Sequence, residues 1–236
     1  MKQKDLCDIL FDRIKKISTP VLLILLMLIW QALGALFLRL FGINHDNLSN
    51  ILKIIFSLIC DISFLGILFF KYKDSLIKDF KNYFNKNILI NLKLSFNYWI
   101  VGLIIMVISN LIIAIITNGT LASNEEAVRE LIDKFPMYMA FQVMLCAPFT
   151  EEIIFRKSIK DATNNKYLFI LLSGFIFGGL HVISSITSLI DLVYLVPYCS
   201  LGFIFAMLYH KTGNIFSTIT AHSFHNTLAL LVYFIG

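Results

Sequence analysis

Two adjacent carboxylates and a guanidinium interrupt an otherwise apolar stretch of the chain. Glu151, Glu152 and Arg156 lie in the segment PFTEEIIFR, which begins at Pro148. An ionised side chain inside a bilayer costs about 2.5–3.5 kcal/mol or more, so three of them together need a reason. On a helix, Glu152 and Arg156 are i,i+4 neighbours and can pair, which leaves Glu151 free to act as a general base or acid. A Glu–Arg bridge at a helix end, without chemistry, is the alternative interpretation.

A histidine follows a pair of glycines in the next apolar stretch. Phe177 and His181 are four residues apart in the sequence FGGLH and so share a helix face. Gly174 and Gly178 form a GxxxG pair, which lets a neighbouring helix approach closely. Taken alone, His181 is better explained as a packing residue that hydrogen-bonds to a neighbouring group than as a catalyst.

Near the C-terminus, His222 and Asn226 are also four residues apart and lie on one helix face. An imidazole and an amide stacked there can bind one reacting group, such as a developing oxyanion. Hydrogen bonding between helices is the alternative. His225 lies next to this pair, and the sequence does not say whether it takes part.

The composition is that of a membrane protein. Of the 236 residues, 58% are hydrophobic and 15% are charged, and the mean hydropathy is +0.80. Soluble domains are about 45–50% apolar and about 25% charged. The net charge of +5 fits basic cytoplasmic loops better than a nucleic-acid partner, which we do not expect. Without CxxC spacing, the four cysteines are predicted to be free thiols: Cys7, Cys60, Cys146 and Cys199.

Apolar runs of about 20 residues predict an all-α bundle of about seven transmembrane helices. Most of the 20 Lys and Arg residues then fall on one side of the membrane. This asymmetry places the N-terminus in the cytoplasm and the C-terminus outside, in a multi-pass protein of the cell membrane. The predicted spans are Pro20–Leu40, Ile54–Phe70, Tyr98–Thr117, Met137–Ile159, Tyr167–Ile183, Leu189–Tyr209 and Ile215–Ile235.

Two of the connections are predicted to be helical. Residues 74–95 place apolar side chains at helical spacing among lysines, which fits either an amphipathic helix on the inner leaflet or a solvated helical loop. Residues 123–134 start with a capping box and end before Pro136, which predicts a short external helix. We expect residues 1–122 to form N-terminal helices and residues 123–236 to form the unit that carries the three motifs.

Depth in the membrane is the argument for treating the three motifs as one site. Glu151 and His222 each lie about 8 residues, or roughly 12 Å, from the inner ends of their predicted spans. On the same count Asn226 lies at roughly 18 Å and His181 at roughly 21 Å. Such a polar cluster must face the interior of the bundle, because lipid cannot satisfy it.

In this order, EExxxR, FxxxH and HxxxN resemble the motifs of the CPBP family, the CAAX-protease and bacteriocin-processing intramembrane endopeptidases, also called the Abi family. The resemblance covers about residues 123–236. It implies a helical membrane core around a polar cavity open to the cytosol, and cleavage of a protein or peptide substrate near its C-terminus. In the eukaryotic and archaeal branch that substrate is a prenylated CaaX protein.

The resemblance also implies roles for individual residues. Glu151 and His181 would activate a water molecule, and His222 and Asn226 would stabilise the oxyanion. Glu152 and Arg156 would orient Glu151. The family implies no required metal, and the sequence has no HExxH motif. Glu151, His181 and His222 could still form a His₂Glu zinc site with an open position, so zinc remains a possible cofactor.

Two functions of other classes compete with proteolysis. One is a non-catalytic membrane partner in bacteriocin self-immunity or scaffolding. The other is a proton- or cation-coupled transporter that would use Asp61, Glu151, Glu152 and Asp191. The lack of an internal repeat counts against transport. CaaX-type processing, bacteriocin maturation and self-immunity all remain open as the biological role.

Overall fold

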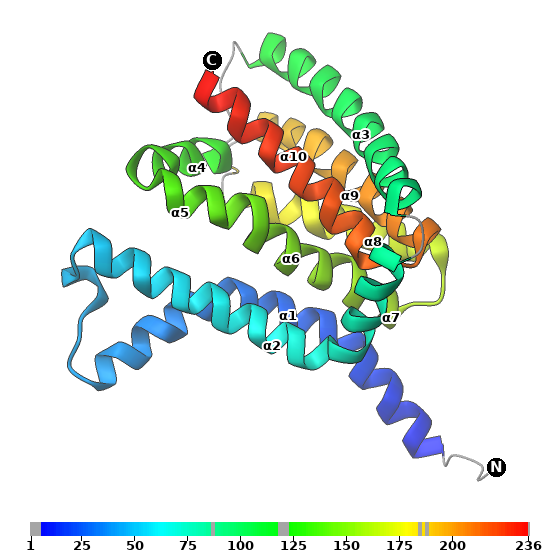
Figure 1. Cartoon of the computed structure of the whole chain (residues 1–236), viewed down its shortest axis with the longest axis horizontal. Helices are drawn as coiled ribbons and strands as arrows, with labels where there is room; N and C mark the ends of the chain where they lie inside the picture. Colours follow the sequence, from blue (N-terminus) through cyan, green and yellow to red (C-terminus); the bar gives the residue numbers. More distant parts are fainter. Residues whose placement is uncertain (1–5, 86–87, 118–122, 184–185, 187–188, 236) are drawn as a thin grey trace.

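The computed structural model describes residues 6–85, 88–117, 123–183, 186 and 189–235. Over these residues the chain forms helices and turns without a strand, which confirms the predicted all-α fold. Figure 1 shows a hairpin of two long helices beside a bundle of shorter ones. The hairpin consists of α1 (Leu6–Leu40) and α2 (Asn50–Asn85), which are connected through the 3₁₀ turn η1 (His45–Asn47).

The bundle carries the three motifs, and its last helix, α10, ends at the C-terminus on the side of the molecule away from the N-terminus (Figure 1). The short helix predicted between residues 123 and 134 is present, with those bounds. The elements of the bundle, apart from the EExxxR segment, are α3 (Ile88–Ile116), α4 (Ser123–Lys134), α8 (Lys166–Val182), η5 (Leu189–Tyr194), α9 (Leu195–Thr212) and α10 (Ile215–Ile235).

The EExxxR segment lies in a helical rod that contains two widened turns. Single π-helical turns of this kind are rare and occur often at functional sites. Here they stand on either side of the turn that carries Glu151 and Glu152. The rod consists of α5 (Pro136–Phe141), the π-helical η2 (Gln142–Cys146), α6 (Ala147–Glu152), the π-helical η3 (Ile153–Ser158) and α7 (Ile159–Ala162).

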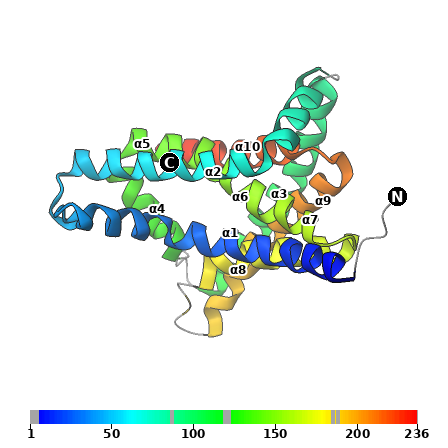
Figure 2. The ribbon, with the colours of Figure 1, turned by 90° about the horizontal axis from the view of Figure 1, so that it is seen from below.

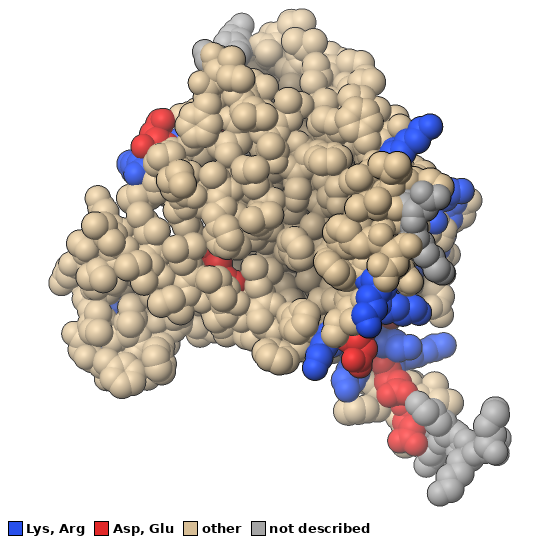
Figure 3. All heavy atoms as spheres, in the orientation of Figure 1, with Lys and Arg blue, Asp and Glu red and all other residues tan. Residues whose placement is uncertain are grey.

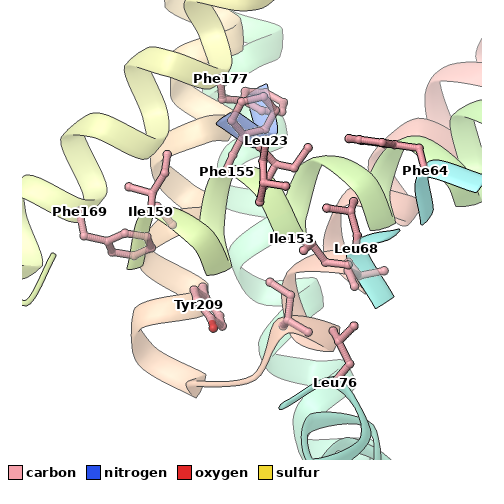
Figure 4. Packing of buried hydrophobic residues seen from close by; sticks show 14 residues of the cluster. Leu23, Phe64, Leu68, Leu76, Ile153, Phe155, Ile159, Phe169, Phe177 and Tyr209 are labelled. Carbon is pink, nitrogen blue, oxygen red and sulfur yellow. The ribbon is translucent and has the colours of Figure 1, made fainter. Parts of the chain in front are cut away.

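A hydrophobic core joins the hairpin to this rod (Figure 4). Leu23 of α1 and Phe64 and Leu68 of α2 pack in one cluster with Ile153 and Phe155 of the rod. All five side chains are buried. Although the first two helices lie outside the three motifs, they form one wall around the segment that carries the carboxylates. The division at residue 122 stays a prediction.

Helices α8 and α9 pack with their backbones in close approach, as the GxxxG pair predicts. A methyl group added at Gly178 would lie 2.7 Å from the backbone nitrogen of Cys199. One added at Gly202 would lie 2.8 Å from the Cα atom of Gly174. Only glycine fits such contacts, so these residues set the distance between the two helices.

By length and composition, four of the described helices can cross a membrane: Cys7–Leu40, Asn50–Asn85, Ile88–Ile116 and Leu189–Thr212. Helix α8 is a shorter apolar helix. The total of seven spans therefore stays a prediction. Both hairpin helices are longer than predicted, since α1 begins at Leu6 instead of Pro20 and α2 continues beyond Phe70.

Residues 74–95 are not the separate surface segment that the sequence indicates. Up to Asn85 they continue α2, and from Ile88 they belong to α3. Leu76 and Tyr83 are buried in the protein, and the ring of Tyr83 lies 6.3 Å from that of Phe216 in α10. Neighbouring helices thus cover part of the apolar face, whereas Phe80 and Phe84 on the same segment are about half exposed.

The charged side chains are unevenly distributed over the surface. On the face shown in Figure 3, most Lys and Arg residues gather at the end of the molecule near the N-terminus. Figure 2 shows the tip of the α1–α2 hairpin at the opposite end. The molecule therefore has a basic end and a hairpin-tip end; which of them faces the cytoplasm stays a prediction.

A methyl group at the α8–α9 contact should destabilise the bundle. We expect Gly178→Ala to lower the free energy of unfolding by about 1–3 kcal/mol, because the backbone of Cys199 cannot move aside. Gly179→Ala is the matched control, since a methyl group there meets no atom within 4 Å. Thermal unfolding in detergent measures both. Equal melting temperatures for the two variants would contradict the close packing.

Candidate active site

A buried ion pair forms the base of the site. Arg156 donates from Nε to Oε2 of Glu152 at 2.9 Å and from Nη2 to Oε1 at 3.3 Å. Both side chains are 0% exposed. This confirms that Glu152 and Arg156 pair, as their i,i+4 spacing predicts. Two parallel N–H···O bonds fix the orientation of the carboxylate as well as its charge.

The guanidinium is held on its other side by α8. Arg156 donates from Nη1 to the hydroxyl of Ser173 at 2.7 Å, and this hydroxyl donates to the carbonyl of Phe155 at 2.8 Å. The guanidinium also lies 4.8 Å from the ring centre of Phe177. Ser173 was not identified from the sequence. The available signal is its spacing, because it lies four residues before Phe177 and eight before His181 on one helix face.

The ion pair in turn orients His222. Nδ1 of His222 lies 2.9 Å from Oε1 of Glu152. Since an ionised carboxylate only accepts hydrogen bonds, Nδ1 carries the hydrogen and donates it. In the neutral ring the lone pair is then on Nε2, which lies 3.9 Å from Oε2 of Glu151.

His181 presents the same nitrogen to Glu151 from another helix. Its Nδ1 lies 2.8 Å from the carbonyl oxygen of Phe177, which fixes the hydrogen on Nδ1. Its Nε2 lies 3.9 Å from Oε2 of Glu151. The ring stacks on Tyr198 of α9, with 5.0 Å between centroids. Nothing in the sequence indicated Tyr198, because the contact joins two helices.

Three hydrogen-bond acceptors therefore converge at one point. They are Oε2 of Glu151 and, in the neutral rings, Nε2 of His181 and of His222. The Glu151 oxygen is buried and has no hydrogen-bond partner in the part of the chain that the structure describes. Such a site favours a small molecule that donates two hydrogens. Water does so and keeps its lone pairs for attack on a carbon atom.

Asn226 lies on the wall of the same cavity, and a second interaction fixes its amide. Its Nδ2 donates to the carbonyl of Val143 at 2.7 Å. In the π-helical turn, Ala147 donates to Gln142 instead of Val143. The next residue that could donate to Val143 is Pro148, which has no N–H. The side chain of Asn226 satisfies this carbonyl and keeps a second N–H for a ligand.

Three of the motif residues form the floor of a cavity of about 1020 Å³: Glu151, His181 and His222. His225 also lines it, and Nδ1 of His225 is buried without a hydrogen-bond partner among the described residues. In Figure 3, acidic atoms are visible deep in a hollow between the hairpin and the bundle. Residues of all three motifs thus line one cavity.

The position of the cavity conflicts with one pair of expectations. Its lining reaches His45 of η1, Lys53 of α2 and Arg129 of α4, all of which belong to the hairpin-tip end of the molecule. If the cavity opens at that end, a cytoplasmic N-terminus and a cavity open to the cytosol exclude each other; the side on which it opens stays a prediction. The sequence did not show the conflict, because depth counted along separate helices says nothing about which end the helices leave open.

The residues proposed for zinc do not form a metal site as they stand. Among the described residues, no three His, Cys, Asp or Glu side chains are arranged to hold a metal ion. Two donors on a tetrahedral zinc lie about 3.3 Å apart, whereas Oε2 of Glu151 lies 3.9 Å from each imidazole nitrogen. We therefore assign no step to a metal.

Comparison with known proteins relates this site to a family. The model for type II CAAX prenyl endopeptidases, Rce1-like, matches residues 133–228, a stretch that contains all three motifs. Over these residues the chain is similar to that family, and the relatives below support the predicted resemblance to CPBP membrane peptidases. Together with the long apolar helices, this similarity shows a multi-pass membrane protein.

Proteins similar to this chain come from several bacteria, and the chain spans less than two thirds of the length of the first of them. The putative membrane peptidase YdiL of Bacillus subtilis is 35% identical over 117 residues, which are 48% of this chain and 44% of YdiL. An uncharacterized protein of Mycoplasma capricolum is 27% identical over 229 residues, covering 89% of this chain and 64% of that protein. The UPF0177 protein YxdF of Lactococcus lactis is 24% identical over 144 residues, 58% and 77% of the two chains. No solved structure matches the chain significantly.

Removing the guanidinium of Arg156 should destabilise the protein strongly. We expect Arg156→Met to cost about 3–5 kcal/mol, because it leaves the Glu152 charge buried without a partner. The double variant Glu152→Gln with Arg156→Met should recover part of this loss. Lys134→Met is the control, since Lys134 and its partner Glu130 are 62% and 73% exposed and such a pair contributes about 0–1 kcal/mol. Thermal unfolding that ranks Lys134→Met with Arg156→Met would contradict this account.

The side of the cavity can be tested by thiol labelling. In a variant without native cysteines, Lys53→Cys reports on the cavity end and Lys211→Cys on the basic end. With a cytoplasmic N-terminus, an impermeant maleimide should label Lys53→Cys in intact cells and Lys211→Cys only after permeabilisation. The reverse pattern would show that the basic end faces outward and that the cavity opens to the cytosol.

Proposed function

We propose that this protein hydrolyses a peptide bond in a membrane-associated protein or peptide. The observation that supports it most is the convergence of Glu151, His181 and His222 on one point at the floor of the cavity. The match to a family of prenyl endopeptidases and the relative described as a putative membrane peptidase point to the same class of reaction.

In the proposed reaction, Glu151 and His181 hold the attacking water. Glu151 accepts a proton from this water as its oxygen bonds to the carbonyl carbon of the substrate. When the carbon–nitrogen bond breaks, the same proton passes to the leaving nitrogen. The products are a carboxylic acid, which gives its remaining proton to the amine or to solvent, and an amine; Glu151 returns to its ionised form.

His222 and Asn226 are the proposed partners of the oxyanion. Nε2 of His222 donates once the ring is protonated, and the Glu152 carboxylate on Nδ1 stabilises that imidazolium. The free N–H of the Asn226 amide supplies a second donor. An oxyanion donor of this kind contributes about 2.7–4 kcal/mol to lowering the barrier. Glu152 and Arg156 act as positioning residues, since they reach the substrate only through His222.

The walls of the cavity favour an apolar substrate segment. Between floor and mouth they are formed by side chains such as Val107, Leu111, Ile132 and Leu201. A lipidated C-terminus and a transmembrane peptide both meet this requirement. CaaX-type processing and the maturation of a bacteriocin precursor are therefore both compatible roles, as is self-immunity through cleavage.

Replacing the proposed base should abolish cleavage while the fold is retained. We expect Glu151→Gln to lower the cleavage rate by about 10²–10⁴-fold, because the amide cannot accept the proton from water. Glu125→Gln is the matched control, since Glu125 lines the same cavity away from the imidazoles. New peptide termini are counted by mass spectrometry in membranes that contain each variant, with the reaction run in H₂¹⁸O so that one labelled oxygen enters the new carboxylate.

A well-folded Glu151→Gln protein that still generated the same termini would overturn the mechanism. If Glu151→Gln instead protected cells against a bacteriocin as well as the wild type, binding without cleavage would account for the function.

A further inference from the structure

A second cavity adjoins the first at Glu151. Its volume is about 270 Å³, and its lining includes Gln31 of α1, Asp61 of α2 and Thr150 of the rod. Gln31, Gln142 and Glu151 line both cavities. Glu151 therefore faces a large cavity with apolar walls and a smaller, half-open pocket with several polar groups, called the chamber below.

Polar groups are concentrated in this chamber although it lies among membrane helices. Oδ2 of Asp61 accepts a hydrogen bond from the hydroxyl of Tyr138 at 3.0 Å, so the carboxylate points toward a neighbouring helix. Oε1 of Gln142 and Oε2 of Glu151 are buried without a hydrogen-bond partner among the residues that the structure describes. Leaving such an acceptor unsatisfied costs about 1–3 kcal/mol.

Water is the ligand that fits these groups. An ordered water needs two to four polar partners, and Gln31, Asp61, Gln142, Thr150 and Glu151 supply them. At about 30 Å³ for each molecule, the chamber has room for several waters. A dry chamber would leave both orphan acceptors unsatisfied next to the Asp61 carboxylate, which itself needs solvation in a low dielectric.

We propose that this chamber is a water reservoir that supplies Glu151 while a substrate fills the large cavity. Each hydrolysis consumes one water, and an apolar segment bound above the imidazoles blocks the route from the mouth. The chamber reaches Glu151 through side chains that line both cavities and so keeps water beside the base. This role rests on the proposed hydrolysis, whereas the presence of water in the chamber does not.

The reservoir assigns a function to the N-terminal helices. Gln31 and Asp61 precede residues 133–228, the part that matches the family model. Asp61 is then a positioning residue: it keeps the chamber hydrated without touching the substrate. Among the groups that line the chamber, the Asp61 carboxylate is the one whose removal we expect to reduce its water content most.

Two native cysteines allow a direct test of hydration. Cys146 lines the chamber and is 2% exposed, whereas Cys199 is 5% exposed and lines neither cavity. X-ray hydroxyl-radical footprinting of the full chain in lipid nanodiscs oxidises thiols beside bound water. We expect Cys146 to be oxidised many times faster than Cys199. Equal, slow oxidation of the two thiols would show a dry chamber and overturn the proposal.

Variants of Asp61 then test the link to the reaction. We expect Asp61→Leu to lower the oxidation of Cys146 to the level of Cys199, and to lower kcat about tenfold or more with little change in KM. Asp61→Asn, which keeps a polar side chain, should retain most of both. Gln31→Leu provides a second drying variant if Asp61→Leu does not fold.

The possible outcomes separate the reservoir from the proposed function. A dried chamber with an unchanged kcat would show that water arrives from the large cavity, and would overturn the reservoir. Unimpaired cleavage by Glu151→Gln would overturn the proposed mechanism, while the labelling of Cys146 would still report whether the chamber is wet.

Discussion

The buried pair of Glu152 and Arg156 is the interaction on which the rest of the site depends. Both side chains are 0% exposed, and neither charge could remain there alone, because the free energy of desolvation would be too large. The two side chains neutralise each other within one helical turn, and each also hydrogen-bonds to a residue of another helix. The carboxylate fixes the hydrogen of His222 on Nδ1, and the guanidinium ties the rod to Ser173 of α8. One ion pair thus orients two of the helices that form the reaction centre.

Short-range spacing explains how much of the site could be predicted. The pairing of Glu152 with Arg156 and the shared face of Phe177 and His181 follow from the 3.6-residue period of one helix. Contacts between helices were not accessible in this way. The stacking of Tyr198 on His181 depends on how α8 and α9 pack. The chamber at Asp61 depends on where the hairpin docks.

The fold shows the same division. Apolar runs predicted the helical class, but not that residues 74–85 continue α2 and pack on α10. That outcome is set by aromatic side chains on another helix, far away in sequence. The side on which the cavity opens was likewise beyond reach, because it depends on where the helices diverge. The helices themselves could therefore be predicted from the local periodicity of the sequence. The contacts between helices could not, because they depend on tertiary packing.

Pro148 affects the orientation of Asn226, because it has no N–H to donate to a backbone carbonyl. Its missing N–H leaves the carbonyl of Val143 to the side chain of Asn226 on another helix. An amide held by one of its hydrogens has lost its freedom to rotate, so its second hydrogen points in a set direction before any substrate arrives. A residue with an N–H at this position would compete for the carbonyl and release the amide. Pro148 in α6 thereby determines whether the amide of Asn226 in α10 is held in one orientation before a substrate binds.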